Sequence, residues 1–356
     1  MCHIHFISNA KVQKITEISL TILKKFCVLH NFLVPLQPKM ERHNPYLRIF
    51  NILLTVAAYG YLGYKLVTFS NYAELVYHFQ TVTWQEYVFL LVCVLLMPVN
   101  VLFESTKWRE LLRRVEPMSL CQAQQQVYYG FVGAFVTPYR AGDYPARAMI
   151  MQNTSQWSSA IGLGLVGSLA LLLVEVILGI PAIILFTHDK VDIPLTRVGV
   201  ALMVLLALMI ILPMLVHRLA KYHWHNKRLH QLFASLSQMD VKQLLRVMAW
   251  SAARYAIWGV QLSVVLAFCG VVLSPLECLI AIPTYYLVIA LFPTLPSADV
   301  AIRGSWAMII FGAFSHNIVG ITLAVTLIWL INTILPMIVG SILYHKRKNI
   351  TTCRIN

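Results

Sequence analysis

Charged residues are scarce in this chain. Asp, Glu, Lys and Arg make up only 12% of its 356 residues, whereas about a quarter of the residues of a soluble globular domain are charged. Hydrophobic residues account for 59%, and the mean hydropathy is +0.71, so the sequence excludes a soluble globule. Long apolar runs recur along the chain instead and predict an all-α, polytopic helical membrane protein.

Motifs for soluble chemistry are missing as well. No P-loop or HExxH motif occurs, and the seven cysteines form no CxxC pair, so the sequence predicts no disulfide framework, metal site or cofactor. Gly162, Gly164 and Gly167 imitate a dinucleotide-binding pattern, but inside an apolar run they indicate close helix packing. The net charge of +14 comes from Lys and Arg in loops beside the apolar runs, which indicates membrane orientation and contact with anionic lipid rather than nucleic acid.

The apolar runs predict six full membrane spans. They are Tyr46–Val67, Trp84–Phe103, Ile161–Phe186, Val198–Val216, Trp250–Leu273 and Ile318–Tyr344. Three shorter pieces remain: Leu120–Val136, Leu279–Phe292 and Gly304–Phe314. The last two are too short to cross alone, so we interpret the short pieces as limbs of two re-entrant hairpins, with eight full spans as the alternative.

Charge asymmetry predicts the orientation and the domain plan. Lys and Arg are concentrated on one side of the spans, which places both termini in the cytoplasm if each broken segment returns to the side that it left. The expected location is the cytoplasmic (inner) membrane. The two halves then contain the same elements in opposite orientations relative to the membrane, which is an inverted repeat. The predicted organisation is a poorly ordered tail or start-site artefact over 1–39, membrane repeats over 40–190 and 191–346, and a cytoplasmic tail over 347–356.

Two polar interruptions, over 137–147 and 293–303, carry most of the functional information. In each, an Asp is followed four residues later by an Arg, Asp143 with Arg147 and Asp299 with Arg303, so both side chains share one face of a short helix. A helix N-terminus beside an Arg suits a lipid phosphate, and Arg140 strengthens the first segment. An internal ion pair that only braces each hairpin is the competing interpretation. The predicted hairpin hinges are Pro138, Gly142, Pro145, Pro293 and Pro296, and Ser297 is the expected N-cap.

Three further charges lie within or beside the spans. Glu175 falls in mid-span, where a carboxylate must be protonated or paired, and is either a site residue or a structural partner. Arg254 is close enough to the start of its span to extend toward the interface. Lys107, next to Glu104 and Trp108, is interpreted mainly as an orientation charge, with contact to phosphate as the alternative.

At these residues the chain resembles the membrane domain of the lysylphosphatidylglycerol synthase (multiple peptide resistance factor) family, also described as flippase-like (UPF0104) proteins. The resemblance covers roughly 45–344 and is carried by Lys107-Trp108-Arg109, by Pro138 with Gly142-Asp143 and Arg147, and by the Pro293–Arg303 segment. Ala298-Asp299 stands where the family commonly has a Gly with an acidic residue. The resemblance implies movement of an anionic or aminoacylated lipid between leaflets. The family's best-known members carry a soluble aminoacyltransferase domain that is absent here, so synthase activity is not expected.

The sequence therefore predicts a flippase-like protein that binds or translocates an anionic, aminoacylated or polyprenyl-phosphate-linked lipid through a polar midplane cavity. Two alternatives remain. One is a membrane-embedded transferase or other lipid-modifying protein with Asp143, Glu175 or Asp299 as general base, although no donor site is recognisable. The other is a non-transporting partner of a lipid or glycan assembly enzyme. A second copy of the chain or a separate lipid-modifying enzyme is the protein partner considered.

Overall fold

The computed structural model describes residues 84–190, 239–292 and 298–352, together with residues 199 and 218. The chain divides into two units, Met1–Arg48 and Ile49–Asn356, and every described residue belongs to the second unit. Several predicted features lie outside the described residues: the 1–39 segment, the span Tyr46–Val67, the span Val198–Val216 except for residue 199, and the hinges Pro293 and Pro296.

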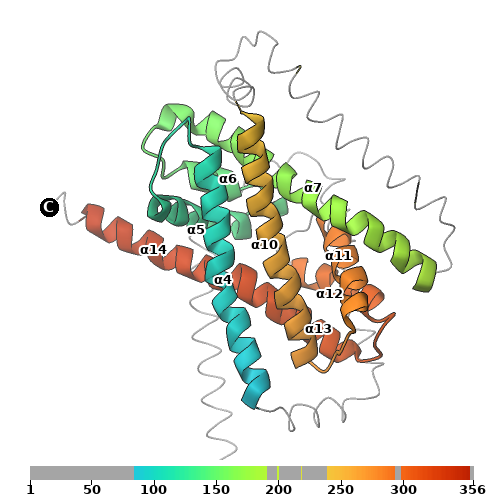
Figure 1. The fold of residues 1–356 in the computed structure, drawn as a ribbon. Helices are drawn as coiled ribbons and strands as arrows, with labels where there is room; N and C mark the ends of the chain where they lie inside the picture. The colour runs from blue at the N-terminus through green and yellow to red at the C-terminus, as the bar shows by residue number, and fades with distance from the viewer. Residues whose placement is uncertain (1–83, 191–198, 200–217, 219–238, 293–297, 353–356) are drawn as a thin grey trace, which may run out of the picture. The chain divides into compact units, whose positions relative to one another are not determined.

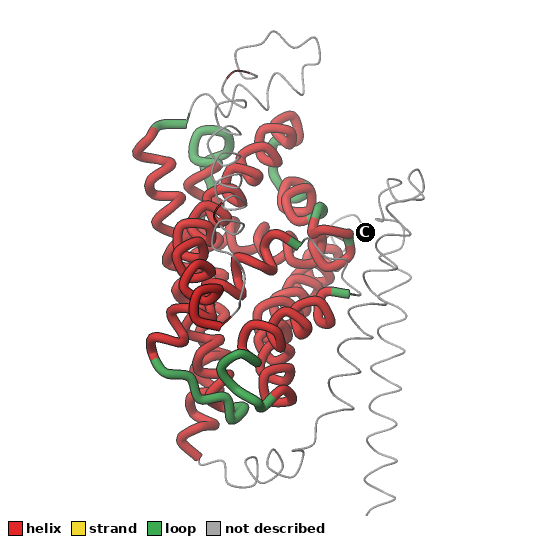
Figure 2. The backbone as a smooth tube through the Cα atoms, turned by 90° about the vertical axis from the view of Figure 1, so that its right-hand side faces the viewer, coloured by secondary structure: helices red, strands yellow, loops and turns green. Residues whose placement is uncertain are grey.

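The described part consists of helices joined by loops, without a β-strand (Figures 1 and 2). The first part contains α4 (Trp84–Leu111), α5 (Leu120–Val136), the 3₁₀ turn η3 (Pro138–Arg140), α6 (Asp143–Ala148), the 3₁₀ turn η4 (Thr154–Gln156) and α7 (Trp157–Lys190). The second contains α10 (Val241–Phe268), α11 (Pro275–Leu291), α12 (Asp299–Phe311), α13 (Ile318–Trp329), the π-helical turn η5 (Leu330–Ile334) and α14 (Leu335–Thr352).

Four stretches in this part of the chain are long and apolar enough to cross a membrane. They are Tyr87–Leu111, Trp157–His188, Val241–Phe268 and Ile318–Leu343. The predictions of helices at these places, and of three shorter helices between them, are confirmed. The all-helical architecture with spans of this length indicates an integral membrane protein.

The boundaries of two predicted spans were wrong. The span predicted to end at Phe103 belongs to a helix that continues to Leu111. The span predicted as Trp250–Leu273 belongs to a helix over Val241–Phe268. In both cases the predicted boundary stopped at charged or polar residues. Several of these residues form ion pairs within the helix or with other helices, as described below.

The packing of the helices explains how the polar segments come together. Helix α4 lies along α10, and α7 lies against α10 and α11 (Figure 1). The short helix α6 packs on α5 and α7, while α12 packs on α11 and α13. Most buried apolar residues of these helices belong to two large clusters, one around Trp108, Leu112 and Leu163 and one around Leu262, Tyr286 and Phe311.

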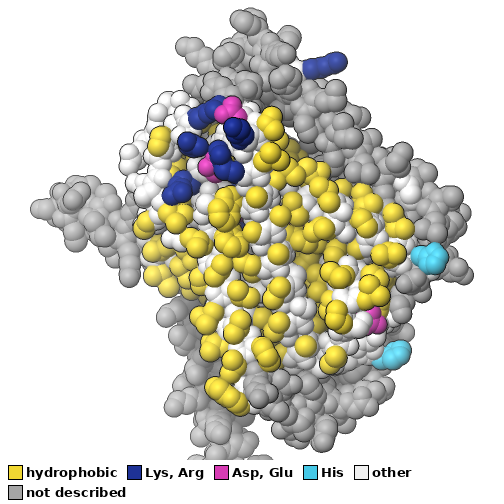
Figure 3. Space-filling view, viewed as in Figure 1, with side chains coloured by type: hydrophobic (Ala, Val, Ile, Leu, Met, Phe, Trp, Pro, Cys, Tyr) yellow, Lys and Arg dark blue, Asp and Glu magenta, His cyan; other side chains and the backbone are white. Residues whose placement is uncertain are grey.

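One face of the molecule is mostly apolar, with charge gathered at one end (Figure 3). The charged end lies over the last turn of α4 and the first turns of α10, where Arg246 pairs with Glu110 at 2.6 Å and Arg114 pairs with Asp240. Exposed apolar side chains cover most of the rest of the described face, as expected for helices surrounded by lipid.

Candidate functional site

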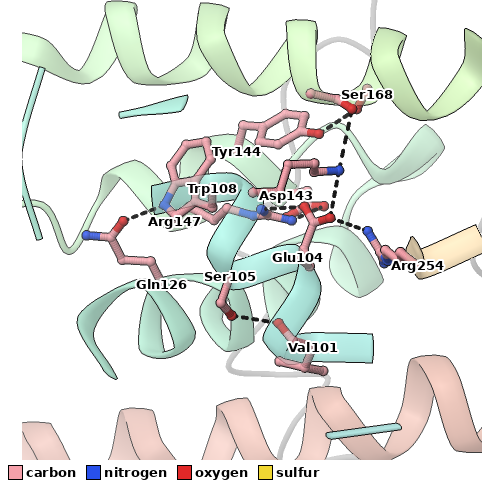
Figure 4. A network of polar contacts seen from close by, with 12 residues as sticks. Val101, Glu104, Ser105, Trp108, Gln126, Asp143, Tyr144, Arg147, Ser168 and Arg254 are labelled. Atoms are coloured by element: carbon pink, nitrogen blue, oxygen red, sulfur yellow. Dashed lines mark hydrogen bonds and ion pairs between the residues drawn. The ribbon is translucent and has the colours of Figure 1, made fainter. Parts of the chain in front are cut away.

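The candidate site begins with one buried carboxylate on α4. Glu104 is 1% exposed and forms ion pairs with three cations (Figure 4). Its Oε1 lies 2.8 Å from Arg147 Nη1, and its Oε2 lies 2.7 Å from Lys107 Nζ and also contacts Arg254 Nη1. Lys107 is one helical turn away on the same helix, whereas Arg147 comes from α6 and Arg254 from α10. We call Glu104, Lys107, Asp143, Arg147 and Arg254 the charge network.

Arg147 uses each of its three nitrogens within this network. Its Nε donates to Asp143 Oδ1 at 2.7 Å, its Nη2 to Asp143 Oδ2 at 3.1 Å, and its Nη1 to Glu104. The guanidinium also lies over the rings of Trp108 and Tyr144, at 5.2 and 5.0 Å from their centroids. Burial lowers the pKa of Arg147, but the carboxylates of Asp143 and Glu104 outweigh it, so its pKa is raised above the ordinary value and the side chain stays charged.

Small residues allow α6 to approach its neighbours closely enough to bring these charges together. A Cβ added at Gly130 of α5 would collide with the Asp143 carboxylate and the Arg147 side chain, and one at Gly164 of α7 would collide with the Tyr144 ring. The interpretation of Gly162-x-Gly164-x-x-Gly167 as a packing motif is confirmed for Gly164. The backbone oxygen of Gly167 also accepts a hydrogen bond from Lys107 Nζ at 3.4 Å.

The turn that leads into α6 is held in an unusual conformation. Tyr139 and Arg140 both have φ of 56°, in the left-handed region that a residue with a Cβ seldom adopts. Thr137 fixes this turn, because its hydroxyl donates to Gly133 O at 2.8 Å and accepts from Gly142 N at 2.6 Å. The side chains of Tyr139 and Arg140 are exposed as a result.

The second polar segment repeats the ion pair in a more open setting. Arg303 Nε lies 2.7 Å from Asp299 Oδ1, and Trp329 Nε1 donates to Asp299 Oδ2 at 2.8 Å. The Arg303 side chain is 28% exposed, against 3% for Arg147. The predicted pairing of Asp299 with Arg303 is confirmed, but the N-cap of α12 is Ala298 rather than Ser297.

Electrostatic contacts connect the two segments. Arg140 interacts with Asp143 and also with Asp299 and Arg303. Glu175 of α7 is buried, and Lys107, Arg254 and Arg303 all act on its charge. The charges predicted from two distant parts of the sequence are thus close enough to influence one another.

A neutral polar chain extends the site between α4, α10 and η5. Arg254 Nε donates to Asn100 Oδ1 at 2.8 Å, Asn332 Nδ2 donates to Gln261 Oε1 at 2.9 Å, and Asn100 and Asn332 are 3.4 Å apart. Asn332 lies in the π-helical turn, an irregularity that is frequent at functional positions.

The structure corrects two interpretations and adds one residue. Lys107 is 2% exposed and ion-paired, so it is not an orientation charge at the interface. Arg254 is buried against Glu104 instead of extending to the interface. Glu104, which the sequence did not single out as a site residue, is the centre of the network. Its spacing of three residues from Lys107 in a continuing helical pattern was the available signal.

Of the predicted hinges, Gly142 is the N-cap of α6 and Pro145 lies in its first turn, while Pro138 opens η3. Within the described ranges, no group of three or more His, Cys, Asp or Glu residues could hold a metal ion. Neither a protein-family model nor a curated protein matches the chain.

Proposed function

We propose that this protein binds the phosphate-bearing headgroup of an anionic lipid in its polar interior and moves the lipid between the leaflets of the cytoplasmic membrane. The observation that carries the proposal is an excess of one positive charge among the linked residues of the interior and of the turn beside it. The interior cations Lys107, Arg147, Arg254 and Arg303 equal in number the carboxylates Glu104, Asp143, Glu175 and Asp299, and the exposed Arg140 beside them adds a fifth positive charge. Unbalanced charge is costly inside a membrane, so an anion is the favoured occupant.

The contacts divide the arginines into two roles. Arg147 has its nitrogens committed to Asp143 and Glu104, which favours a bracing role. Arg303 is more exposed, and within the described ranges Asp299 is the one carboxylate that pairs with it. Arg140 is exposed at the strained turn. We assign headgroup contact to Arg303 and Arg140, because a guanidinium can hold two phosphate oxygens at once.

An inverted repeat is part of the proposal, and the helix pattern supports it. Helices α4 and α10 each have 28 residues, and α5 and α11 each have 17. Both 17-residue helices begin with a capping box, Ser119 with Gln122 and Ser274 with Glu277. Each is followed by a helix that starts at the Asp of an Asp–Arg pair.

The packing supports the same relation. In the proposed repeat, α5 corresponds to α11, α6 to α12, and α7 to the segment formed by α13 and α14. The packing of α5 on α14 then corresponds to that of α11 on α7, and the packing of α6 on α7 to that of α12 on α13. Helices α4 and α10 exchange with each other and also pack together. Two halves related in this way suit alternating access, in which each side opens in turn to a shared central site. We retain the cytoplasmic location of both termini in this proposal.

The test is a leaflet-exchange assay in proteoliposomes that contain fluorescently labelled phosphatidylglycerol or labelled polyprenyl phosphate. The wild type should speed exchange of one of these lipids. Arg303→Lys should slow it by roughly ten- to a hundred-fold, the loss expected for one charge-assisted contact. Arg113→Lys, at a mostly exposed side chain outside the interior, is the matched control and should match the wild type.

Exchange at the protein-free rate for both lipids would refute the proposal. Covalent modification of the labelled lipid without exchange would instead indicate the transferase alternative.

A further inference from the structure

Glu175 differs from the other carboxylates of the interior. It is 7% exposed and lies near the middle of α7. Glu104, Asp143 and Asp299 each have an ion-pair partner within 2.8 Å. Glu175 forms neither an ion pair nor a hydrogen bond with any residue in the described part of the chain. A carboxylate buried in a span without a close partner is expensive when ionised and inexpensive when protonated.

The groups that face Glu175 come from four other helices. Its charge interacts with Lys107 of α4, Arg254 of α10 and Arg303 of α12. Its charge also interacts with two phenols, those of Tyr255 on α10 and Tyr286 on α11. The three cations are near enough to influence the charge of Glu175, but each forms its ion pair with another carboxylate. Lys107 and Arg254 pair with Glu104, and Arg303 pairs with Asp299.

A second buried group next to Glu175 is unpaired. The hydroxyl of Tyr255 is buried and has no hydrogen-bond partner in the ranges that the structure describes. Ser251 Oγ and Trp258 Nε1 are unpaired in the same way, and the three residues follow one another at helical spacing along one face of α10. Unpaired buried polar groups are unusual, and here they occur on the helix that carries Arg254.

We propose that Glu175 is a proton-binding site whose occupancy is coupled to that of the headgroup. The inference rests on the proposed function, because the coupling partner is the anionic headgroup held near Arg303. An ionised Glu175 repels that anion, whereas the protonated acid does not. Headgroup and proton therefore enter together: the carboxylate takes a proton from water as the phosphate approaches and returns it to water when the phosphate leaves.

A purely structural Glu175 makes a different prediction. If its only role is to balance the nearby arginines, it stays ionised with and without lipid, and no proton accompanies binding. Proton counting separates the two cases. The phosphodiester of phosphatidylglycerol keeps a single charge at neutral and mildly acidic pH, so any proton taken up must reside on the protein.

The experiment is calorimetric titration of the purified full chain in detergent with dihexanoyl phosphatidylglycerol, in buffers of different ionisation enthalpy between about pH 5 and about pH 8. The wild type should take up close to one proton per bound lipid within part of this range. Its affinity should fall by up to about ten-fold for each pH unit as the pH rises. Glu175→Gln should bind without proton uptake and without this pH dependence.

The controls make each outcome decisive. Glu116→Gln changes a carboxylate that caps the backbone of Gln152 and Asn153 in a loop, and should behave like the wild type. Glu175→Met, an apolar replacement of similar size, should also abolish uptake and serves if the Gln variant does not fold. Lipid binding by the wild type without proton uptake, or uptake that persists in both Glu175 variants, overturns the inference alone. Absence of wild-type binding at every pH, both to this lipid and to a short-chain polyprenyl phosphate, overturns the proposed function, and the inference with it.

Discussion

Replacement of Glu104 by Gln is the sharpest test of the charge network. In the wild type, Oε1 accepts from Arg147, while Oε2 accepts from Lys107 and Arg254, and all four side chains are buried. Gln preserves the shape but removes the charge that the three cations share. It also places an amide N–H₂ where one oxygen had accepted hydrogen bonds.

The magnitude follows from the burial of these groups. Removing one partner of a buried ion pair typically costs about 3–5 kcal/mol, because the remaining charge is stranded. Here three cations lose one counterion, so we expect a loss of at least about 3 kcal/mol in the free energy of unfolding. Equilibrium unfolding in mixed micelles with increasing SDS, followed by tryptophan fluorescence, measures this difference.

Glu110→Gln is the matched control. Glu110 lies further along α4 and pairs with Arg246, whose side chain is 48% exposed. Loss of this pair should therefore cost at most about 1 kcal/mol. Adding Lys107→Met to Glu104→Gln removes one stranded charge and should recover part of the stability. Equal costs for the Glu104 and Glu110 variants, or no recovery in the double variant, would refute the reasoning.

Three further predictions concern neighbouring residues. Tyr139→Gly should leave the free energy of unfolding unchanged or raise it by up to about 1 kcal/mol, because glycine accepts positive φ freely. The control Ala141→Gly, at an ordinary φ, should lower it, and chemical unfolding of both variants measures the difference. Arg147→Lys should lower stability more than Arg303→Lys, because an ammonium cannot reproduce the three directed contacts of a buried guanidinium. Similar losses in SDS unfolding would contradict the assignment of a bracing role to Arg147 and of headgroup contact to Arg303. Gly130→Ala should reduce lipid exchange and stability together, since its Cβ would displace the Asp143–Arg147 pair, and normal values in both assays would show that the close approach is dispensable.

The sequence by itself determined the fold class and the local ion pairs. Long apolar runs separated by charged loops are sufficient to predict spanning helices, since their length is set by the bilayer and their composition by contact with lipid. The pairs Asp143–Arg147 and Asp299–Arg303 were also predictable, because residues four apart on a helix are neighbours wherever that helix lies.

Tertiary structure alone decided the centre of the site. Glu104 is joined to partners 43 and 150 residues away, and no periodicity in the sequence encodes contacts of that separation. Those contacts also explain why α4 continues past Phe103. Lys107 can be buried because Glu104 of the same helix pairs with it. Glu104 in turn is paired by Arg147 of α6 and Arg254 of α10. Local pattern fixes the helices and the pairs within them, whereas the cost of burying charge fixes which helices must meet.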